Sequence, residues 1–248
     1  MITRHSMIDN SLDVTFVVPC LNEAANIAAT LETIRSTMCE FRLSYEILVI
    51  DDGSTDGTAC VVEEYRLAHP EIELRLHKNP KNLGLATSFV NGAFLGKGKY
   101  FKLISGDNAE PKESLVKVFS HLGEADMLVA HMTRVEGKSV FRMGLSNLYT
   151  FLINLISGYR LKYYNGAAVH LRYNVMRWGP YSFGFGFQAE LITKLLDEGA
   201  SYIEIPVLFT HRQKSGGNSA LNLKNFLSVC HTLLELMIRR LRRRTIGR

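Results

Sequence analysis

Three acidic side chains follow one short apolar segment closely enough to act at a single site. Asp51 and Asp52 come directly after Glu46–Ile50, a nearly continuous apolar stretch typical of a strand buried on both faces of a parallel sheet. Asp56 follows after a glycine that permits a tight turn. Open α/β sheets bind ligands beyond the carboxyl ends of their strands. Carboxylates placed there suit the hydroxyls of a ribose, the N–H edge of a base, or a cation.

The same acids also have a purely local interpretation. Asp56 or Thr58 can cap the helix that follows, and the pair Asp51 and Asp52 could simply end a strand. For Asp56, considered by itself, we prefer the capping role. A helix cap does not require two adjacent acids, so the whole segment indicates a binding site.

Length and composition predict a folded globular protein. The chain has 248 residues, of which 46% are hydrophobic and 21% charged, enough for one large α/β domain or one domain with an appendage. Four scattered cysteines without paired spacing favour a reduced, cytosolic protein that lacks disulfides and zinc. The first ten residues lack an apolar signal core, and no apolar segment approaches the ~20 residues that cross a bilayer, so neither secretion nor a membrane span is expected.

Strands and helices alternate through the first half of the chain. The expected strands are Asp13–Pro19, Glu46–Ile50, Glu71–Leu76, Tyr100–Ile104 and Ala125–Ala130. Helical spacing separates them, and Asn22 is the expected N-cap of the first helix. Strand, helix and strand in this rhythm predict a parallel sheet, and the alternation weakens beyond residue 131.

Four motifs occur in order along this half. They are Val17-Val18-Pro19 with Asn22-Glu23, then Asp51-Asp52-Gly53-Ser54-Thr55-Asp56, then Asn82-Leu83-Gly84, and a loop acid at Asp107. With them the chain resembles family 2 glycosyltransferases of the GT-A fold, from about Val14 to Ala220. The subgroup it resembles most is the polyprenyl-phosphate sugar transferases, such as dolichyl-phosphate mannose and glucose synthases.

The resemblance implies an α/β fold with a Rossmann-like, mostly parallel sheet flanked by helices. We expect a single GT-A domain over residues 1–219, with a nucleotide-sugar half at about 13–130 and an acceptor half at about 131–219. Residues 220–248 are expected to form an amphipathic, basic C-terminal helix.

The resemblance also assigns a donor site. Its implied members are Pro19, Leu21, Glu23, Ile50, Asp51, Asp52, Gly84, Ser105, Gly106 and Asp107. Asp52, with Asp51 beside it, would hold the base or ribose of a GDP- or UDP-linked sugar. Asp107 would coordinate Mg²⁺ or Mn²⁺ on the diphosphate. Arg212 and Lys214, from a basic loop, would add positive charge on the same oxygens.

The metal loop departs from the family pattern. The family usually shows Asp-x-Asp, whereas Ser105-Gly106-Asp107 supplies only the second acid. Asn108 and Glu110 are oxygen donors that could compensate, and an ordinary turn ahead of Pro111 is the alternative. The missing acid also leaves open a non-catalytic nucleotide-sugar-binding subunit.

The acceptor side is expected around Gln188, Glu190 and Ser219. Family members that glycosylate a sugar hydroxyl usually carry an Asp general base about two residues before the helix Glu, and here that position is Gln188, which cannot take a proton. A phosphate acceptor is already an anion and needs no base. The favoured function is therefore inverting transfer of a sugar to polyprenyl phosphate at the cytoplasmic membrane face. Transfer to a saccharide hydroxyl in cell-surface polysaccharide synthesis is the alternative.

Two later segments have helical apolar spacing. Val140–Tyr159 is expected to pack on the core, like most amphipathic helices. Leu221–Arg244 carries a wide apolar stripe and ends in an arginine cluster, which suits a helix lying on a membrane surface. A dimerisation or capping helix with a solvated tail is the alternative, so an oligomer is possible. Nucleic-acid binding is disfavoured, because no base-reading pattern accompanies the arginines.

Overall fold

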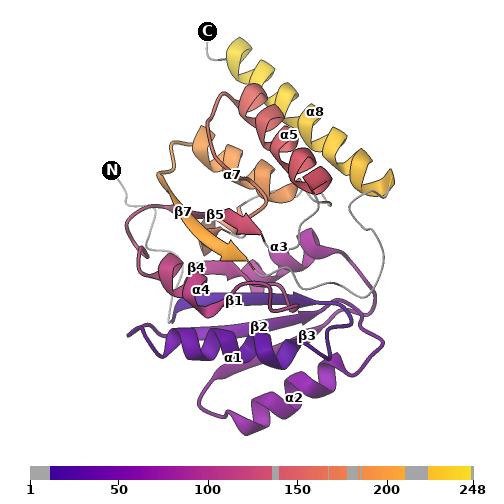
Figure 1. The fold of residues 1–248 in the computed structure, drawn as a ribbon, viewed down its shortest axis with the longest axis vertical. Helices are drawn as coiled ribbons and strands as arrows, with labels where there is room; N and C mark the ends of the chain where they lie inside the picture. The colour runs from indigo at the N-terminus through magenta and orange to yellow at the C-terminus, as the bar shows by residue number, and fades with distance from the viewer. Residues whose placement is uncertain are drawn as a thin grey trace.

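A computed structural model describes residues 12–135, 140–166, 168–177, 184, 186–209 and 223–246. Within these residues the strands form one sheet in the order β3-β2-β1-β4-β6-β5-β7 (Figure 1). The strands are β1 Leu12–Cys20, β2 Tyr45–Asp51, β3 Glu73–Lys78, β4 Gly98–Leu103, β5 Met127–Val135, β6 Val169–Leu171 and β7 Tyr202–Phe209. The helices are α1 Ile27–Met38, α2 Thr58–Ala68, α3 Leu85–Leu95, α4 Lys112–Phe119, α5 Val140–Ser157, α6 Arg172–Met176, α7 Phe187–Asp197 and α8 Leu223–Ile246.

Helices cover both faces of the sheet. On one face, apolar residues of α1, α2 and α4 pack against alternate residues of the strands, including Phe16 and Ile47. On the other face, α3, α5, α6 and α7 pack against the intervening strand residues, including Val17 and Leu48. Strands buried on both faces favour apolar residues at successive positions, which explains the apolar segments Phe16–Val18 of β1 and Ile47–Ile50 of β2.

The five strands expected in the first half are present, and the mostly parallel sheet is confirmed. β1 pairs in parallel with both β2 and β4, and β2 pairs in parallel with β3. One strand was not foreseen. β6 lies between β4 and β5 and is antiparallel to both. It has only three residues, so its sequence carries no usable periodicity.

The expected start of the first helix was wrong. α1 begins at Ile27 with Asn26 at the N-cap position, whereas Asn22 adopts a left-handed conformation with φ of 57°. The Oδ1 atom of Asn22 instead accepts a hydrogen bond from the N–H of Thr55 at 2.9 Å. α2 begins at Thr58 after Gly57, and the Oδ1 atom of Asp56 accepts a hydrogen bond from the N–H of Thr58 at 2.9 Å, as expected of a helix cap.

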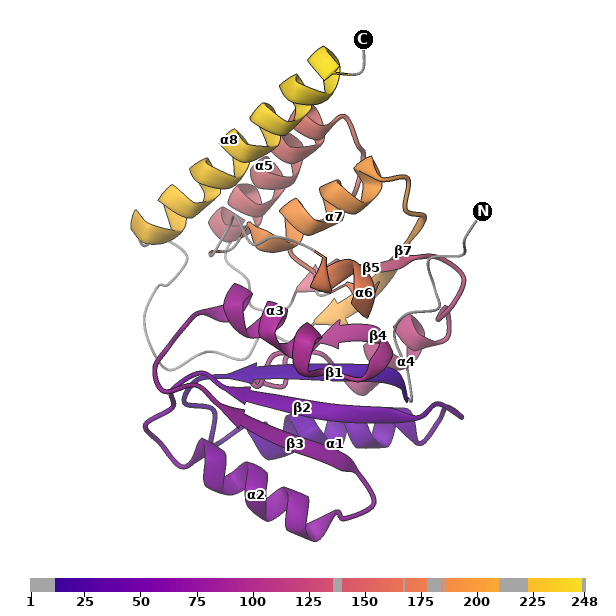
Figure 2. The ribbon, with the colours of Figure 1, turned by 180° about the vertical axis from the view of Figure 1, so that it is seen from behind.

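The two later helices lie close to their expected ranges. α5 and α8 run side by side at one end of the molecule, with α7 between them and the sheet (Figures 1 and 2). Among the described residues, no helix combines the length and the apolar character needed to cross a membrane. The expected boundary at residue 219 lies outside the described residues and stays a prediction.

The unforeseen strand generates a prediction about acid stability. His170 in β6 is fully buried, and burial lowers its pKa from 6.5 to about 4, helped by the positive charge of Lys102. Between these pKa values the unfolded chain binds a proton that the folded chain does not bind, so stability is lost as the pH falls through this range. We expect His170 to account for about 2 kcal/mol of the loss in unfolding free energy between pH 7 and pH 5.

Urea denaturation of wild type and His170→Gln at the two pH values measures this contribution. The wild type should lose more stability on acidification than the variant. His121→Gln, at a partly exposed position on the surface, is the matched control and should behave like wild type. Equal losses in wild type and His170→Gln would contradict the prediction.

Candidate functional site

The carboxyl ends of three neighbouring strands lie on one edge of the sheet. β1 is the central one of the three, and its Cys20 is the register partner of Asp51 at the end of β2. On its other side, Val17 of β1 is the partner of Leu103 at the end of β4. The loops that carry Asp51, Asp52 and Asp107 therefore start from adjacent strands at the same edge.

The loop after β1 is bonded to the loop after β2. The N–H of Asn22 donates to Ser54 Oγ at 2.9 Å, and the N–H of Glu23 donates to Thr58 Oγ1 at 2.9 Å. Asp56 contributes as well, because its Oδ2 accepts the N–H of Ala24 at 3.2 Å and its Oδ1 accepts the N–H of Thr58. The polar residues after Asp52 thus serve mainly to hold two loops together.

The Asp52 carboxylate is fully engaged within the protein. Its Oδ1 accepts hydrogen bonds from Asn79 Nδ2 at 2.7 Å and from the N–H of Leu83 at 2.9 Å. Its Oδ2 accepts the N–H of Gly84 at 2.8 Å. Asp52 is 5% exposed, so these bonds form away from water. The carboxylate fixes the loop between β3 and α3 to the end of β2, which is a positioning role.

Asp51 keeps one carboxylate oxygen for other partners. Its Oδ1 accepts the N–H of Ser54 at 2.9 Å, and Oδ2 accepts no hydrogen bond from the part of the chain that the structure describes. The acids also act on Cys20, whose thiol pKa is raised to about 12, first by burial and then by Asp51, Glu23, Asp56 and Asp52. Four acidic side chains therefore lie near the end of β1, and carboxylates there suit hydrogen-bond donors or a cation.

The loop after β4 packs directly on the end of β1. The N–H of Gly106 donates to the carbonyl of Pro19 at 3.3 Å, and Thr30 Oγ1 donates to the carbonyl of Gly106 at 2.9 Å. A Cβ on Gly106 would lie 2.9 Å from the Cβ of Cys20, so the approach depends on glycine. Asp107 Oδ1 is buried and has no hydrogen-bond partner among the described residues. A buried carboxylate oxygen without a donor is available to a cation.

The two residues expected to compensate for the missing loop acid both have partners in the protein, but Glu110 keeps one oxygen free, because its Oε2 is buried without a hydrogen-bond partner among the described residues. Asn108 Oδ1 accepts a hydrogen bond from Thr33 Oγ1 at 2.9 Å. Glu110 forms a buried ion pair, with its Oε1 at 2.9 Å from Lys102 Nζ. Burial raises the pKa of Glu110, and the charge of Lys102 opposes that rise. The pair anchors the loop that carries Asp107.

The donor set can be tested against the chemistry of a divalent cation. Among the described residues, no group of three or more His, Cys, Asp or Glu side chains could hold a metal. Mg²⁺ and similar ions are commonly held by one or two carboxylates together with substrate phosphates. Asp107 fits this second arrangement, in which a bound diphosphate completes the site.

The remaining donor-site residues lie around these loops. Leu21 is 40% exposed at the end of β1, while Ile50 is fully buried in β2 and can offer only its main chain. Glu23 Oε2 accepts Asn26 Nδ2 at 3.0 Å. Gly84 has φ of 90°, which glycine adopts without strain, and its N–H points to Asp52. Ser105 connects β4 to Gly106 and is partly buried.

The expected acceptor residues are partly described. Gln188 and Glu190 lie in the first turn of α7 and are 5% and 4% exposed. Gln188 Oε1 and Glu190 Oε2 are buried without a hydrogen-bond partner in the described chain, as is the hydroxyl of Tyr149 on α5. Burial raises the pKa of Tyr149, and Glu190 contributes to the rise. Arg212, Lys214 and Ser219 lie outside the described residues.

Sequence reasoning missed three residues of this region. Asn79 bonds Asp52, Lys102 bonds Glu110, and Tyr149 places its hydroxyl in the buried polar region near Glu190. Asn79 stands directly before a proline at the end of β3, a turn signal that could have drawn attention to it. Lys102 is a lysine inside an apolar strand, which requires a buried partner.

Comparisons with known proteins identify the family of the chain. The family described as Glycosyl transferase family 2 matches residues 15–181. A dolichyl-phosphate beta-glucosyltransferase of Trichomonas vaginalis is 32% identical over 136 residues, which cover 50% of this chain and 39% of that protein. A polyprenol monophosphomannose synthase of Mycolicibacterium smegmatis is 25% identical over 214 residues, covering 79% of this chain and 77% of that protein.

The chain covers only part of several relatives. It spans 39%, 46% and 35% of three of them: the Trichomonas protein, a dodecaprenyl-phosphate galacturonate synthase of Rhizobium johnstonii and a dolichyl-phosphate beta-glucosyltransferase of Dictyostelium discoideum.

Solved structures share the fold. Glucosyl-3-phosphoglycerate synthase from Mycobacterium tuberculosis, in complex with Mn²⁺, UDP and glucosyl-3-phosphoglycerate, has a TM-score of 0.63 at 16% identity and covers 93% of this chain and 80% of that one. Mannosyltransferase PcManGT from Pyrobaculum calidifontis, in complex with GDP-Man and Mn²⁺, has a TM-score of 0.59 at 20% identity. The match covers 84% of this chain and 61% of that one. The GT-A fold expected from the sequence is thus confirmed. With a family match over most of its length and the strand-end acids in place, this chain belongs to glycosyl transferase family 2.

Proposed function

We propose that the chain is an inverting glycosyltransferase that moves a sugar from a GDP- or UDP-linked donor to a polyprenyl phosphate. The observation that carries the proposal is the junction of three strand-end loops, which presents the unpaired Oδ1 of Asp107 beside the end of β1. Relatives named as dolichyl-, dodecaprenyl- and polyprenol-phosphate enzymes support a lipid phosphate as the acceptor.

On the donor side, two acids have complementary roles. Asp51 offers its second oxygen to the N–H edge of a base or to a ribose hydroxyl. Asp107 would hold Mg²⁺ or Mn²⁺ through its unpaired oxygen, as the Mn²⁺ complexes of the structural neighbours suggest. A cation so held would stabilise the negative charge that gathers on the diphosphate as the sugar leaves. Arg212 and Lys214 are proposed to add positive charge to the same oxygens.

On the acceptor side, the absence of a base at Gln188 matters most. An amide cannot take a proton from an attacking hydroxyl, whereas a phosphate oxygen attacks as an anion. We therefore propose that Gln188, Glu190 and Ser219 orient the acceptor and take no proton from it. The domain is proposed to act at the cytoplasmic face of a membrane, with the basic helix α8 as the contact.

Asp107→Asn tests the proposed donor site. The variant keeps the size of the side chain but removes the charge that holds the cation, so transfer of labelled sugar to a polyprenyl phosphate should fall at least about 100-fold. Mn²⁺ should also stop raising the melting temperature of the UDP or GDP complex, a readout independent of turnover. Thr33→Val, which removes only the bond to Asn108, is the matched control and should retain both properties.

The acceptor is tested in the same assay. Wild type with Mn²⁺ should glycosylate polyprenyl phosphate and leave both free glycan and 3-phosphoglycerate unmodified. Product formed only on the glycan would show that the acceptor is a saccharide hydroxyl. No turnover with any donor, together with nucleotide binding, would favour the non-catalytic subunit.

Substitutions of the two neighbouring acids, Asp51 and Asp52, should have different effects on the free energy of unfolding. Asp52→Ala leaves three buried donors without an acceptor and should lower the unfolding free energy by about 3 kcal/mol or more. Asp51→Ala removes one bond, from Ser54, and should cost about 1 kcal/mol while weakening nucleotide binding. Urea denaturation and nucleotide titration measure both. A larger loss of stability in Asp51→Ala than in Asp52→Ala would reverse the assigned roles.

A further inference from the structure

Large apolar side chains are exposed on both helices at the end of the molecule away from α2 (Figures 1 and 2). On α5 they are Met143, Leu145, Leu148, Phe151 and Leu155, and on α8 they are Leu227, Leu234, Met237 and Leu241; each is at least 39% exposed. We call this set the α5/α8 face. We propose that the α5/α8 face docks on an anionic lipid bilayer, with α5 contributing as much as the basic helix α8. The choice of a lipid surface rests on the proposed function.

The expectation for α5 was a helix packed on the core, and only one side of it does so. Tyr149 and Ile153 are buried against the core cluster. Leu148, Phe151 and Leu155 are 52%, 59% and 65% exposed. Apolar residues on the exposed side of a helix do not contribute to the core and stay in contact with water unless something covers them. The sequence pattern alone could not show this, because both sides of α5 are apolar.

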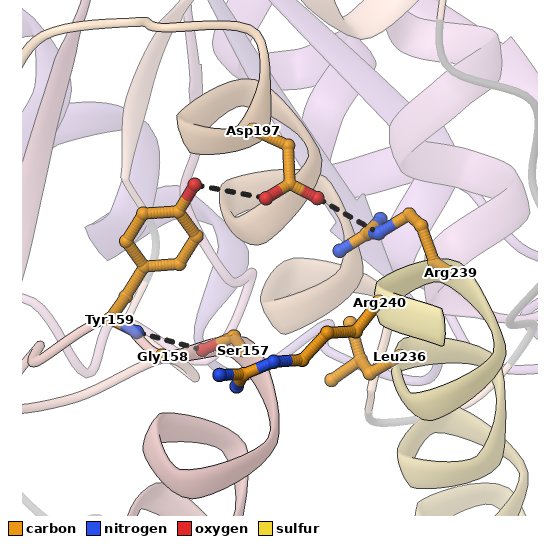
Figure 3. Close-up of a pocket in the computed structure, with 7 residues that line it drawn as sticks. All are labelled: Ser157, Gly158, Tyr159, Asp197, Leu236, Arg239 and Arg240. Atoms are coloured by element: carbon orange, nitrogen blue, oxygen red, sulfur yellow. Dashed lines mark hydrogen bonds and ion pairs between the residues drawn. The ribbon is translucent and has the colours of Figure 1, made fainter. Parts of the chain in front are cut away.

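The orientation of α8 is set by contacts on its inner side. A Cβ on Gly186, just before α7, would lie 1.8 Å from Thr232 Oγ1, so α8 passes close over the start of α7. Arg239 Nε pairs with Asp197 Oδ2 at 3.2 Å (Figure 3). Arg240 donates to the carbonyl of Leu155 at 3.0 Å, in the last turn of α5. The side chains of the α5/α8 face therefore lie on the outer side of a firmly held helix pair.

The charged residues of α5 and α8 indicate what kind of surface covers the α5/α8 face. Over Val140–Ser157 and Leu223–Ile246 the one acidic residue is Glu235. The basic residues of the same two segments are Arg142, Lys224, Arg239, Arg240, Arg242, Arg243 and Arg244. Arg239 pairs with Asp197 and Arg240 bonds to α5, so five other basic residues of these segments stand against Glu235. Two copies of the chain docked through this face would bring these like charges together. An anionic bilayer neutralises them and accepts the apolar side chains at its head-group boundary.

The placement fits the acceptor side of the proposed site. α7 lies between the helix pair and the sheet, and its first turn carries Gln188 and Glu190. Docking through the α5/α8 face would hold the acceptor helix next to the surface in which a lipid phosphate resides.

Vesicle co-sedimentation of the full chain tests the proposal. The vesicles contain phosphatidylcholine alone or mixed with phosphatidylglycerol, and wild type should bind only the mixture, less tightly at high salt. Phe151→Ser should weaken binding about tenfold, since it removes one large apolar side chain from the contact. Phe94→Ser on α3 is the matched control, because Phe94 is 58% exposed and Phe151 59% exposed; it should bind like wild type.

Other outcomes would overturn the inference. Wild-type affinity in Phe151→Ser would show that α5 does not contact the bilayer. If light scattering shows that wild type is a dimer, that it does not bind vesicles, and that Phe151→Ser is a monomer, a second copy of the chain covers the face. Transfer to a short, water-soluble polyprenyl phosphate tests the function separately and should be unchanged in Phe151→Ser. If wild type fails to transfer yet binds vesicles through Phe151, the proposed function fails and the docking stands.

Discussion

The carboxylate of Asp52 holds together the part of the molecule that could meet a nucleotide. It accepts three hydrogen bonds from the loop between β3 and α3, whose Asn79 N–H also donates to the carbonyl of Asp51 at 2.8 Å. The loops come so close that a Cβ on Gly53 would lie 2.8 Å from the main chain of Lys81. Buried donors left without an acceptor are costly, so this arrangement is specified strongly. One acid of the pair thus holds the loops together, and the other, Asp51, is the one proposed to contact a ligand.

The sequence could predict the strands of the first half because their signals are local. Apolar segments ended by Pro19, Asp51 and Asp107 mark the strand ends, and parallel pairing places those ends on one edge. The division of labour between Asp51 and Asp52 could not be predicted. The donors to Asp52 lie 27 to 32 residues further along the chain, and nothing near Asp52 indicates them.

The loop after β4 and helix α5 were predicted less well for a related reason. Glu110 looks like a spare oxygen donor in the sequence, but Lys102 is fully buried in β4 and pairs with one of its two carboxylate oxygens. The two sides of α5 are equally apolar in sequence, and only the packing of Tyr149 and Ile153 tells which one faces the core. The partner of Glu110 and the buried side of α5 are therefore set by tertiary contacts, which local sequence patterns do not show.

The reversed strand β6 also governs the order in which the sheet can be completed. β3, β2, β1 and β4 are contiguous in space and are all synthesised by residue 103. β5 is made next, yet it cannot sit beside β4, because that place belongs to Val169–Leu171. A growing chain thus exposes the bare edge of β4 until residue 171 has emerged, and bare edges recruit other chains. Premature termination or slow translation within this interval would yield a partial sheet prone to aggregation. Chains that extend past residue 171 can cover the edge of β4 with β6.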